Sequence, residues 1–322
     1  MRDVLAALAD QEGTTVSAME AVVVVDGADD GTVKELEGYE PPFRLVVLEQ
    51  VHSGVATARN RGWKQASAEL VLFLDDDVIP DKHLVSEHLE AHRANPDAVV
   101  LGQVVQGPDG GEAWTWYDGW TMHRKYAALA AKELPSGIHF GGNFSLARTR
   151  LEEVDGFDHV LPRSEHVDLG YRLAQRGVEF RYAPDAVAVH VGRRDFKTWE
   201  MSYRLDGRMD VALYRDRGYA GGLPTILASY HDRHWLNRLL LRMAFAHRSA
   251  EKRLILGTSR IGSLAHRARL RPVVRLAFSA TANIVYWGGV RDGLRGSRAF
   301  WRAISETRSH SARPYRLRGR EA

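Results

Sequence analysis

LVLFLDDDVIP, residues 70–80, is an apolar run that ends in three consecutive aspartates. Five adjacent apolar residues are typical of a strand that is buried on both faces of a sheet. Asp75, Asp76 and Asp77 repel one another at the end of that strand, and folding alone does not require them there. A hard cation such as Mg²⁺ or Mn²⁺ would relieve the repulsion, usually together with substrate phosphates. The stretch therefore predicts a site for a metal and a diphosphate; the alternative is a solvated turn in which Asp81 caps the next helix.

The residues around this stretch alternate strand and helix patterns. We predict further strands over residues 21–25, 44–48 and 98–103, which are nearly continuous apolar runs. Residues 55–65 and 81–92 show the apolar spacing of helices. Such alternation is typical of crossover units that feed a mainly parallel sheet, and ligands of these sheets bind beyond the carboxyl ends of the strands. The predicted fold class is therefore α/β.

Charge is distributed unevenly along the chain. The 322 residues contain 44 Lys and Arg and 41 Asp and Glu, but residues 233–322 hold 20 of the basic residues and only 4 of the acidic ones. An acidic body thus precedes a basic region. The chain has no cysteine, which excludes disulfides, zinc–thiolate sites and cysteine nucleophiles. Asp10 and Glu12 interrupt the first residues before a long apolar run develops, so a secretory signal is not expected. We therefore expect a cytoplasmic location.

Several short motifs follow one another in the order and spacing of one enzyme family. They are VVVVDGADDGT (22–32), ARNRG (58–62), FLDDDVIP (73–80), GN (142–143), GFD (156–158), DLGYRL (168–173) and YAPDA (182–186). Together they resemble the inverting family-two glycosyltransferases over about residues 3–192. The resemblance implies the GT-A fold, a Rossmann-like mixed sheet. It also implies hexosyl transfer from a nucleotide-diphosphate sugar to a hydroxyl of a glycan, lipid-linked or natural-product acceptor, with inversion and with a divalent metal, Mg²⁺ or Mn²⁺, as cofactor.

The resemblance also implies roles for acidic residues and one histidine. Asp75 and Asp77 match the Asp-x-Asp motif, with Asp77 the direct metal ligand, Asp75 nearer the ribose and Asp76 on the donor side. Asp26 matches the position that contacts the nucleobase; its alternative role is that of a turn residue in a Gly-rich loop. His190 resembles a third metal ligand of some related transferases, and a satisfied core histidine is the alternative.

Four further residues are expected near the donor. Arg59 and Asn60 lie on the predicted helix before the metal-bearing strand, where a cation could face the diphosphate; a surface arginine is the alternative for Arg59. Gly142 permits close backbone approach, and the amide of Asn143 could bridge sugar hydroxyls. The alternative for this pair is a tight turn before a strand.

The general base is where the chain departs from the family pattern. Inverting transfer needs a base on the acceptor hydroxyl, and the family usually supplies the aspartate of a Glu-Asp pair at a helix start. Here the stretch reads SEHVD over residues 164–168, so His166 replaces that aspartate. Three residues remain candidates for the general base: His166, because an imidazole titrates near neutral pH, Glu165 beside it, and Asp168. Asp168 ranks lower because it could pair with Arg172, and His166 could instead be a surface histidine at a helix end.

We predict three regions: a GT-A-like catalytic domain over residues 1–195, a helical basic region over 196–312, and a disordered basic tail over 313–322. Residues 276–290 are the most apolar stretch of the helical region, bounded by arginines and too short to span a membrane comfortably. Such helices suit the surface of an anionic membrane, which would place the protein peripherally on the inner face; a helical subdomain with solvated arginines is the alternative. No nucleic-acid module is recognised, so nucleic acid is not an expected partner.

Two further expectations concern the acceptor and the start of the chain. Trp114, Trp116, Tyr117 and Trp120 could stack on acceptor sugars or pack in a core. The family normally begins with a strand that helps to bind the nucleobase, whereas this sequence starts in the following helix, so we expect the first strand to be missing. Together with His166, this favours an alternative function, a non-catalytic or truncated relative that binds a nucleotide sugar without turnover.

Overall fold

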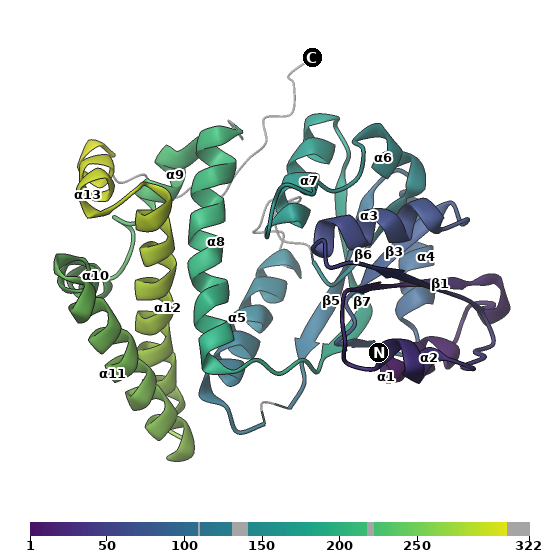
Figure 1. Ribbon diagram of the computed structural model, residues 1–322, viewed down its shortest axis with the longest axis horizontal. Coiled ribbons are helices and arrows are strands. Elements are labelled where there is room, and N and C mark those ends of the chain that lie inside the picture. Colours follow the sequence, from purple (N-terminus) through teal and green to yellow (C-terminus); the bar gives the residue numbers. More distant parts are fainter. Residues whose placement is uncertain (109, 131–140, 218–221, 308–322) are drawn as a thin grey trace. The chain divides into compact units, whose positions relative to one another are not determined.

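The computed structural model describes residues 1–108, 110–130, 141–217 and 222–307 (Figure 1). The chain divides into two compact units. The first comprises Met1–Gly107 and Met122–Gly192, and the second comprises Pro108–Thr121 and Arg193–Ala322. The predicted disordered tail, residues 313–322, lies outside the described residues. The first unit carries all the strands of the described residues, and the second unit is helical.

The first unit contains two sheets. β1 (Glu20–Asp26) and β2 (Arg44–Gln50) form a parallel pair. The other sheet has the order β3-β6-β5-β7-β4, with strands β3 (Leu70–Leu74), β4 (Val78–Pro80), β5 (Val99–Gln106), β6 (Asn143–Ala147) and β7 (Phe180–His190). Among the neighbouring strand pairs of this sheet, β5 and β7 are parallel and the other three pairs are antiparallel. The prediction of a mainly parallel sheet is wrong, because apolar runs locate strands but do not fix the direction in which β6 and β4 run.

Short helices cover the first unit. They are α1 (Arg2–Ala9), α2 (Thr32–Leu36), α3 (Val55–Gln65), α4 (Leu84–Ala94), α6 (Arg148–Glu153) and α7 (Glu165–Gln175), with a 3-10 turn at Val16–Ala18. The predicted helix 55–65 is α3. The helix predicted over 81–92 begins only at Leu84, because the Asp81 carboxylate accepts a hydrogen bond from the His83 amide (3.2 Å) and forms a turn before the helix.

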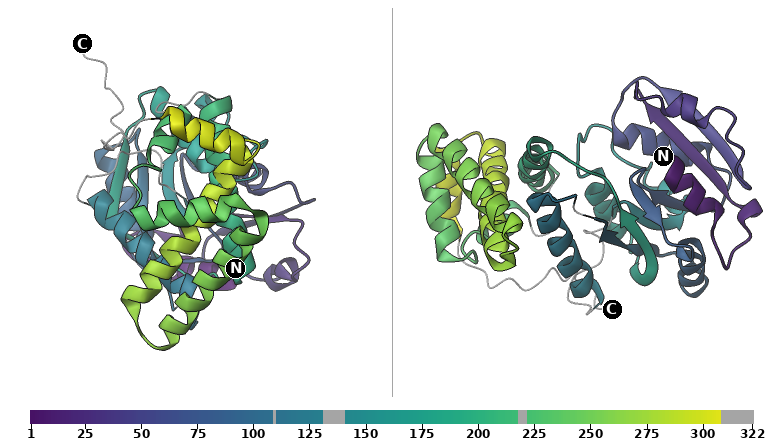
Figure 2. Two further views of the ribbon diagram at one scale, coloured as in Figure 1. Left: turned by 90° about the vertical axis from the view of Figure 1, so that its left-hand side faces the viewer. Right: turned by 90° about the horizontal axis from the view of Figure 1, so that it is seen from below.

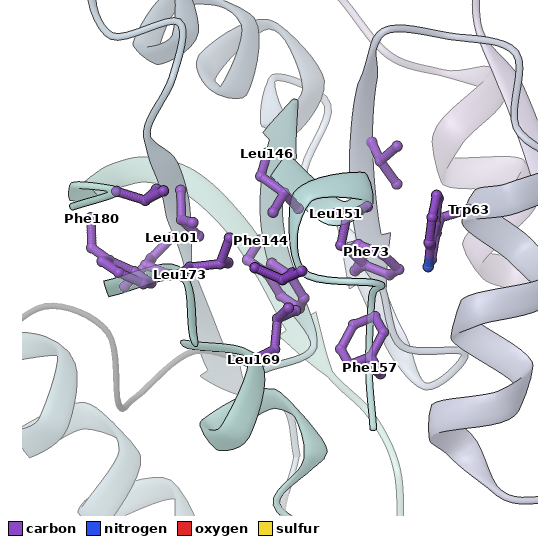
Figure 3. Packing of buried hydrophobic residues seen from close by; sticks show 14 of the residues in the cluster. Trp63, Phe73, Leu101, Phe144, Leu146, Leu151, Phe157, Leu169, Leu173 and Phe180 are labelled. Carbon is purple, nitrogen blue, oxygen red and sulfur yellow. The ribbon is translucent and has the colours of Figure 1, made fainter. Parts of the chain in front are cut away.

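A continuous apolar core fixes the positions of the strand ends in the first unit (Figure 3). Phe73 of β3 stacks on Phe144 of β6, with ring centroids 4.9 Å apart, and meets the edge of Phe157 at 5.2 Å. Leu169 and Leu173 of α7 enter the same cluster and are fully buried. The end of β3 and the start of α7 are therefore held by one close-packed core, so polar groups that follow them keep fixed positions.

The second unit is built around one central helix. Its helices are α8 (Phe196–Asp216), α9 (Gly222–Ala228), α10 (Trp235–Ala246), α11 (Arg248–Arg267), α12 (Arg271–Gly293) and α13 (Ser297–Glu306), together with the first turns of α5 (Ala113–Ala130). α12 packs against α8, α10 and α11 (Figure 1). Phe278 and Trp287 on α12 are fully buried. The described residues include no helix that is long and apolar enough to cross a membrane.

Burial of α12 corrects one prediction. Residues 276–290, which the sequence analysis placed at a membrane surface, form most of this central helix, and Val274, Ile284 and Val290 have no exposed surface. Hydropathy alone does not distinguish a helix that faces lipid from one that faces other helices. The apolar composition of this stretch is explained by packing inside the helical unit. Leu276 is the exception, with 70% of its surface exposed.

The aromatic residues 114–120 contribute to the helical unit. Tyr117 is buried in a cluster with Trp199 and Phe278, and the three tryptophans of this stretch pack around it. Asp118 accepts hydrogen bonds from the Trp199 indole (3.0 Å) and the Tyr203 hydroxyl (2.9 Å). These contacts support the core role that the sequence analysis weighed for the aromatic residues, and they explain why Pro108–Thr121 groups with the helical unit rather than with the flanking sheet.

Two glycines allow α8 and α12 to approach closely. A Cβ atom at Gly289 would overlap the carbonyl oxygen of Arg204, and one at Gly207 would overlap that of Tyr286. We expect Gly289→Ala to destabilise the helical unit by about 2 kcal/mol, because backbone atoms cannot move aside as side chains do. Thermal unfolding followed by circular dichroism measures this. The matched control is Gly257→Ala on α11, where a Cβ has no neighbour within 4 Å and helix propensity favours alanine by up to about 1 kcal/mol. Equal unfolding temperatures for the two variants would contradict this packing.

Candidate functional site

The three consecutive aspartates form the tight turn between β3 and β4. The amide of Asp75 donates to the carbonyl of Gly142 (3.2 Å), and the amide of Val78 donates back to the carbonyl of Asp75 (3.1 Å). Gly142 has φ +77°, and a Cβ on it would lie 2.9 Å from an oxygen of the Asp75 carboxylate. Glycine is therefore needed at 142 for both its conformation and its closeness to the turn. The side chains of Asp75 and Asp77 are 41% and 42% exposed, so both carboxylates can meet a ligand.

Asp77 and His190 are brought together as the sequence predicted. Val78 of β4 pairs with His190 of β7, and the carbonyl of Asp77 accepts from the amide of Val191 (2.8 Å). The His190 Nε2 lies 3.3 Å from Asp77 Oδ2. Behind them the chain passes so close that a Cβ at Gly192 would overlap the Asp77 carboxylate. The other ring nitrogen of His190, Nδ1, is buried and has no hydrogen-bond partner among the described residues.

The spacing of this pair fits a shared cation. Two ligand atoms that are each about 2.1–2.2 Å from one Mg²⁺ or Mn²⁺ and occupy adjacent positions lie about 3 Å apart. Asp77 Oδ2 and His190 Nε2 are 3.3 Å apart, which is close to that value. Within the described residues no group of three His, Asp or Glu side chains could hold a metal ion. The predicted trio of Asp75, Asp77 and His190 is thus present as a pair, with Asp75 turned to another partner.

That partner is Arg59 on α3. Its guanidinium donates to Asp75 Oδ1 (2.7 Å) and to Glu165 Oε1 (2.5 Å), and it lies over the Phe157 ring at 5.6 Å. Only 15% of the Arg59 side chain is exposed. The alternative of a surface arginine is therefore wrong, and Arg59 links the aspartate turn to the start of α7 through one buried cation.

Asp76, the middle aspartate, has an exposed side chain. Its pKa is raised above the ordinary value, first by partial desolvation of the carboxyl and then by the negative charges of Asp77 and Asp75. The three carboxylates therefore repel one another in the folded protein as the sequence predicted, and a nearby cation would reduce that repulsion.

Glu165 and His166 begin α7. Ser164 before them adopts φ +63°, a left-handed conformation that is uncommon for serine. Glu165 is 4% exposed, and His166 Nδ1 lies 3.2 Å from Glu165 Oε1. Burial alone would raise the pKa of Glu165, but the hydrogen bond and charge of His166, together with the charge of Arg59, outweigh it and lower the pKa to about 2. Glu165 is therefore ionised at neutral pH, while His166 keeps 30% of its side chain exposed.

Asp168, the third candidate base, has no exposed surface. Its Oδ2 accepts from the Arg172 Nε at 2.7 Å, one helical turn away, and Arg172 also donates to the carbonyl of Val154 (2.6 Å). This is the i,i+4 pairing that the sequence analysis gave as the alternative. The geometry assigns Asp168 to the anchoring of α7 rather than to contact with an acceptor.

Asn60 and Asn143 were both predicted near the donor, and the side-chain amides of both make hydrogen bonds within the protein. Asn60 Oδ1 accepts from the Trp63 indole (2.9 Å) and the Phe157 amide (2.8 Å), while its Nδ2 donates to the Phe157 carbonyl (2.7 Å). These bonds hold the loop that follows α6. Asn60 is partly buried, and both its amide oxygen and its amide nitrogen hydrogen-bond to neighbouring parts of the first unit.

Asn143 is 2% exposed and lies within a buried polar network. Its Oδ1 lies 2.9 Å from His88 Nε2, and its Nδ2 donates to the carbonyls of Ala186 (2.9 Å) and Gln103 (3.2 Å). Burial lowers the pKa of His88 to about 4, so this histidine is neutral at pH 7. The sequence analysis did not identify His88, which lies within the predicted helix over residues 81–92. These hydrogen bonds connect α4, β5, β6 and β7.

Asp26 ends β1, in the two-stranded sheet. Its carboxylate accepts from the amides of Ser53 (2.7 Å) and Gly54 (2.8 Å) and from the Gln50 amide group (2.8 Å). Burial raises the pKa of Asp26, but these three hydrogen bonds outweigh that effect and leave the pKa lowered. Asp26 thus shapes the loop that leads into α3, and 17% of its side chain remains exposed at the strand end.

Comparison with known proteins gives a consistent result. Residues 1–154 match the family model described as glycosyl transferase family 2. The chain is 29% identical over 183 residues to the pre-mycofactocin glycosyltransferase of Mycobacterium tuberculosis, which covers 55% of this chain and 39% of that protein. It is 40% identical over 197 residues to the validoxylamine A glucosyltransferase of Streptomyces hygroscopicus subsp. jinggangensis, which covers 52% and 47%. The chain spans less than half the length of these two relatives.

A solved structure supports the fold assignment. The chain superposes on a mannosyltransferase of Pyrobaculum calidifontis, in complex with GDP-Man and Mn²⁺, with a TM-score of 0.59. Sequence identity is 20%, and the superposition covers 91% of this chain and 82% of the other. The predicted GT-A fold is confirmed.

Proposed function

The chain carries a domain of glycosyl transferase family 2, and from that premise we propose that it transfers a sugar from a nucleotide-diphosphate donor to a hydroxyl acceptor. The proposed reaction inverts the anomeric carbon and uses a divalent metal. The observation that carries the proposal is the pairing of Asp77 with His190 at 3.3 Å, beside the turn in which Asp75 is held by Arg59. Two side chains of the types that bind metals and one largely buried cation thus lie close to the turn that joins β3 and β4.

Asp77 and His190 would hold the metal, and phosphate oxygens of the donor would complete its ligands. Mg²⁺ and Mn²⁺ commonly combine one or two protein carboxylates with substrate phosphates in this way. When bound, the cation would neutralise charge that develops on the leaving diphosphate. The Mn²⁺ in the Pyrobaculum mannosyltransferase complex favours manganese as the first cation to test.

His166 is the proposed general base. Its Nδ1 faces the Glu165 carboxylate, which is ionised at neutral pH and fixed by Arg59, so the ring is held in one orientation. Nε2 then takes the proton of the acceptor hydroxyl while that oxygen attacks the anomeric carbon and the bond to the diphosphate breaks. The proton stays on the imidazole, and the electron pair leaves with the diphosphate. Glu165 is a poor base because of its low pKa, and we assign it to positioning His166.

The test is a donor screen with the purified chain. UDP, GDP and dTDP sugars are supplied with Mn²⁺ and a panel of hydroxyl acceptors, and release of nucleoside diphosphate is measured with and without EDTA. We expect release from one class of donor, and we expect EDTA to abolish it. Turnover that persists in EDTA would contradict the metal assignment, and absence of both turnover and donor binding would overturn the proposal.

One observation favours a second candidate function. His166 stands where the family pattern has an aspartate, so the chain could bind a nucleotide sugar without transferring it. Calorimetric titration of the same donors distinguishes the two functions. Tight, Mn²⁺-dependent donor binding without any nucleotide release would indicate that the chain binds the donor without transferring its sugar.

A further inference from the structure

The helical unit exposes apolar side chains along two neighbouring helices. On α10, Trp235, Leu239 and Met243 are 61%, 45% and 50% exposed, and their spacing of four residues places them on one side of the helix. On α11, Ile261 and Leu264 are 55% and 64% exposed. α10 and α11 pack against each other and lie on the side of the unit that Figure 2 turns toward the viewer in its left panel. We call the exposed sides of these two helices the outer face.

The charged side chains of α10, α11 and the start of α12 are almost all basic. Residues 235–276 contain nine arginines, one lysine and a single acid, Glu251. Glu251 is 5% exposed and is paired with Arg204 (2.6 Å) and Arg291 (2.7 Å) inside the unit. The only carboxylate of the segment is therefore neutralised by arginines from other helices, and the segment presents positive charge to the solvent. Arg242 and Arg253 are exposed beside the apolar side chains.

A groove adjoins the outer face. It has a volume of about 400 Å³ and is lined by Trp114, Phe196, Ser259, Arg260, Ser263, Leu264 and Arg267. Leu264 belongs both to the groove and to the exposed apolar residues of α11. Arg260 and Arg267 can donate to a phosphate, while the two aromatic rings accept apolar groups. The groove thus combines the groups that a phosphate-bearing lipid headgroup would contact.

We propose that the outer face of α10 and α11 docks on an anionic lipid bilayer. Apolar side chains interleaved with arginines on surface helices are the pattern of helices that lie at the headgroup boundary, where the apolar groups enter the acyl region and the cations meet lipid phosphates. A second copy of the same face would bring positive charges together, which disfavours self-association. This docking uses α10 and α11, whereas the sequence analysis assigned it to residues 276–290, and it does not depend on sugar transfer.

Flotation with vesicles tests the proposal. The full chain is mixed with vesicles of phosphatidylcholine alone or of phosphatidylcholine with phosphatidylglycerol, and the bound fraction is measured. We expect binding to the anionic vesicles only, and we expect it to weaken at high salt because the attraction is electrostatic in part. The double variant Leu239→Glu/Ile261→Glu and the double variant Arg242→Glu/Arg253→Glu are each expected to reduce partitioning at least about tenfold.

The controls separate docking from folding. Val160→Glu introduces a glutamate at an apolar residue that is 71% exposed in the first unit, and it is expected to leave vesicle binding unchanged. Circular dichroism of each variant verifies that its helices and unfolding temperature are retained. No binding to anionic vesicles, equal binding to neutral vesicles, or full binding by the folded double variants would overturn the proposal. A wild-type dimer that the double variants convert to a monomer would identify the outer face as a self-association surface instead.

Discussion

Asp77→Ala is expected to lower kcat/KM for metal-dependent transfer by at least about 100-fold, which corresponds to about 3 kcal/mol of transition-state stabilisation. The carboxylate of Asp77 lies 3.3 Å from His190, and the two side chains form the proposed metal pair. Without Asp77, His190 alone would face the cation, and a single imidazole does not retain Mg²⁺ or Mn²⁺ well. The variant should nevertheless fold, because this carboxylate is 42% exposed.

Two measurements check the effect of Asp77→Ala. Release of nucleoside diphosphate gives the rate, and titration with Mn²⁺ in the presence of donor gives the metal affinity. Asp155→Asn is the matched control, because Asp155 is 94% exposed and its φ of +54° is one that asparagine adopts readily. Unchanged Mn²⁺ affinity in Asp77→Ala would remove Asp77 from the metal site, whereas loss of rate in both variants would indicate a nonspecific effect.

His166→Ala is expected to lower kcat by about 100-fold to 10,000-fold, the usual contribution of a general base, with a smaller change in KM. Glu165→Gln is expected to lower kcat less, because it removes the group that orients His166 and not the one that takes the proton. His159→Ala, at an exposed histidine of the preceding loop, serves as the control and should retain the wild-type rate. If His166→Ala kept the wild-type kcat, the base assignment would be wrong.

The dependence of kcat on pH separates the two side chains. A protonated imidazole cannot accept a proton, so with His166 as the base the rate should fall on acidification. Glu165 has a pKa of about 2 in the folded protein, so as a base it would keep the rate level until the solution is strongly acidic. If kcat stayed constant from pH 8 to pH 5, Glu165 rather than His166 would be the general base.

Glu165 also makes a stability contribution with a defined sign. Its pKa is lower in the folded protein than in an unfolded chain, where it lies near 4.3, so the ionised form is favoured by folding. This contribution is fully present above the unfolded value and is lost as the pH falls from there toward about 2. The loss adds to acid unfolding of the first unit.

Sequence patterns predicted the parts of the site that depend on chain order. The aspartate turn after β3 follows from the apolar run that ends in three acids, and the placement of His190 beside Asp77 was implied by the resemblance to the transferase family. The roles of Asn60 and Asn143 could not be predicted in this way, because an amide that faces a ligand and one that satisfies buried backbone groups have the same sequence.

The packing of elements that are distant in the sequence could not be predicted from the sequence either. Residues 276–290 have the composition of an interfacial helix, yet α8, α10 and α11 surround them. The same limit applies to Pro108–Thr121, which the chain order places beside the sheet and which packs instead with Trp199. Both errors arise because hydropathy reports how much surface an element must bury and not which partner buries it.

The contact of Arg59 with both Asp75 and Glu165 has a consequence for sequence divergence. One planar guanidinium pairs with Asp75 in the aspartate turn and with Glu165 beside the proposed base, so one cation is shared by two anions. Lysine cannot replace it, because a single ammonium lacks the two parallel donors. A change at position 165 leaves Arg59 with Asp75 as its carboxylate partner, and a change at 59 removes the guanidinium that pairs with the buried Glu165 carboxylate. Among homologues, the residues at positions 59, 75 and 165 are therefore expected to change together.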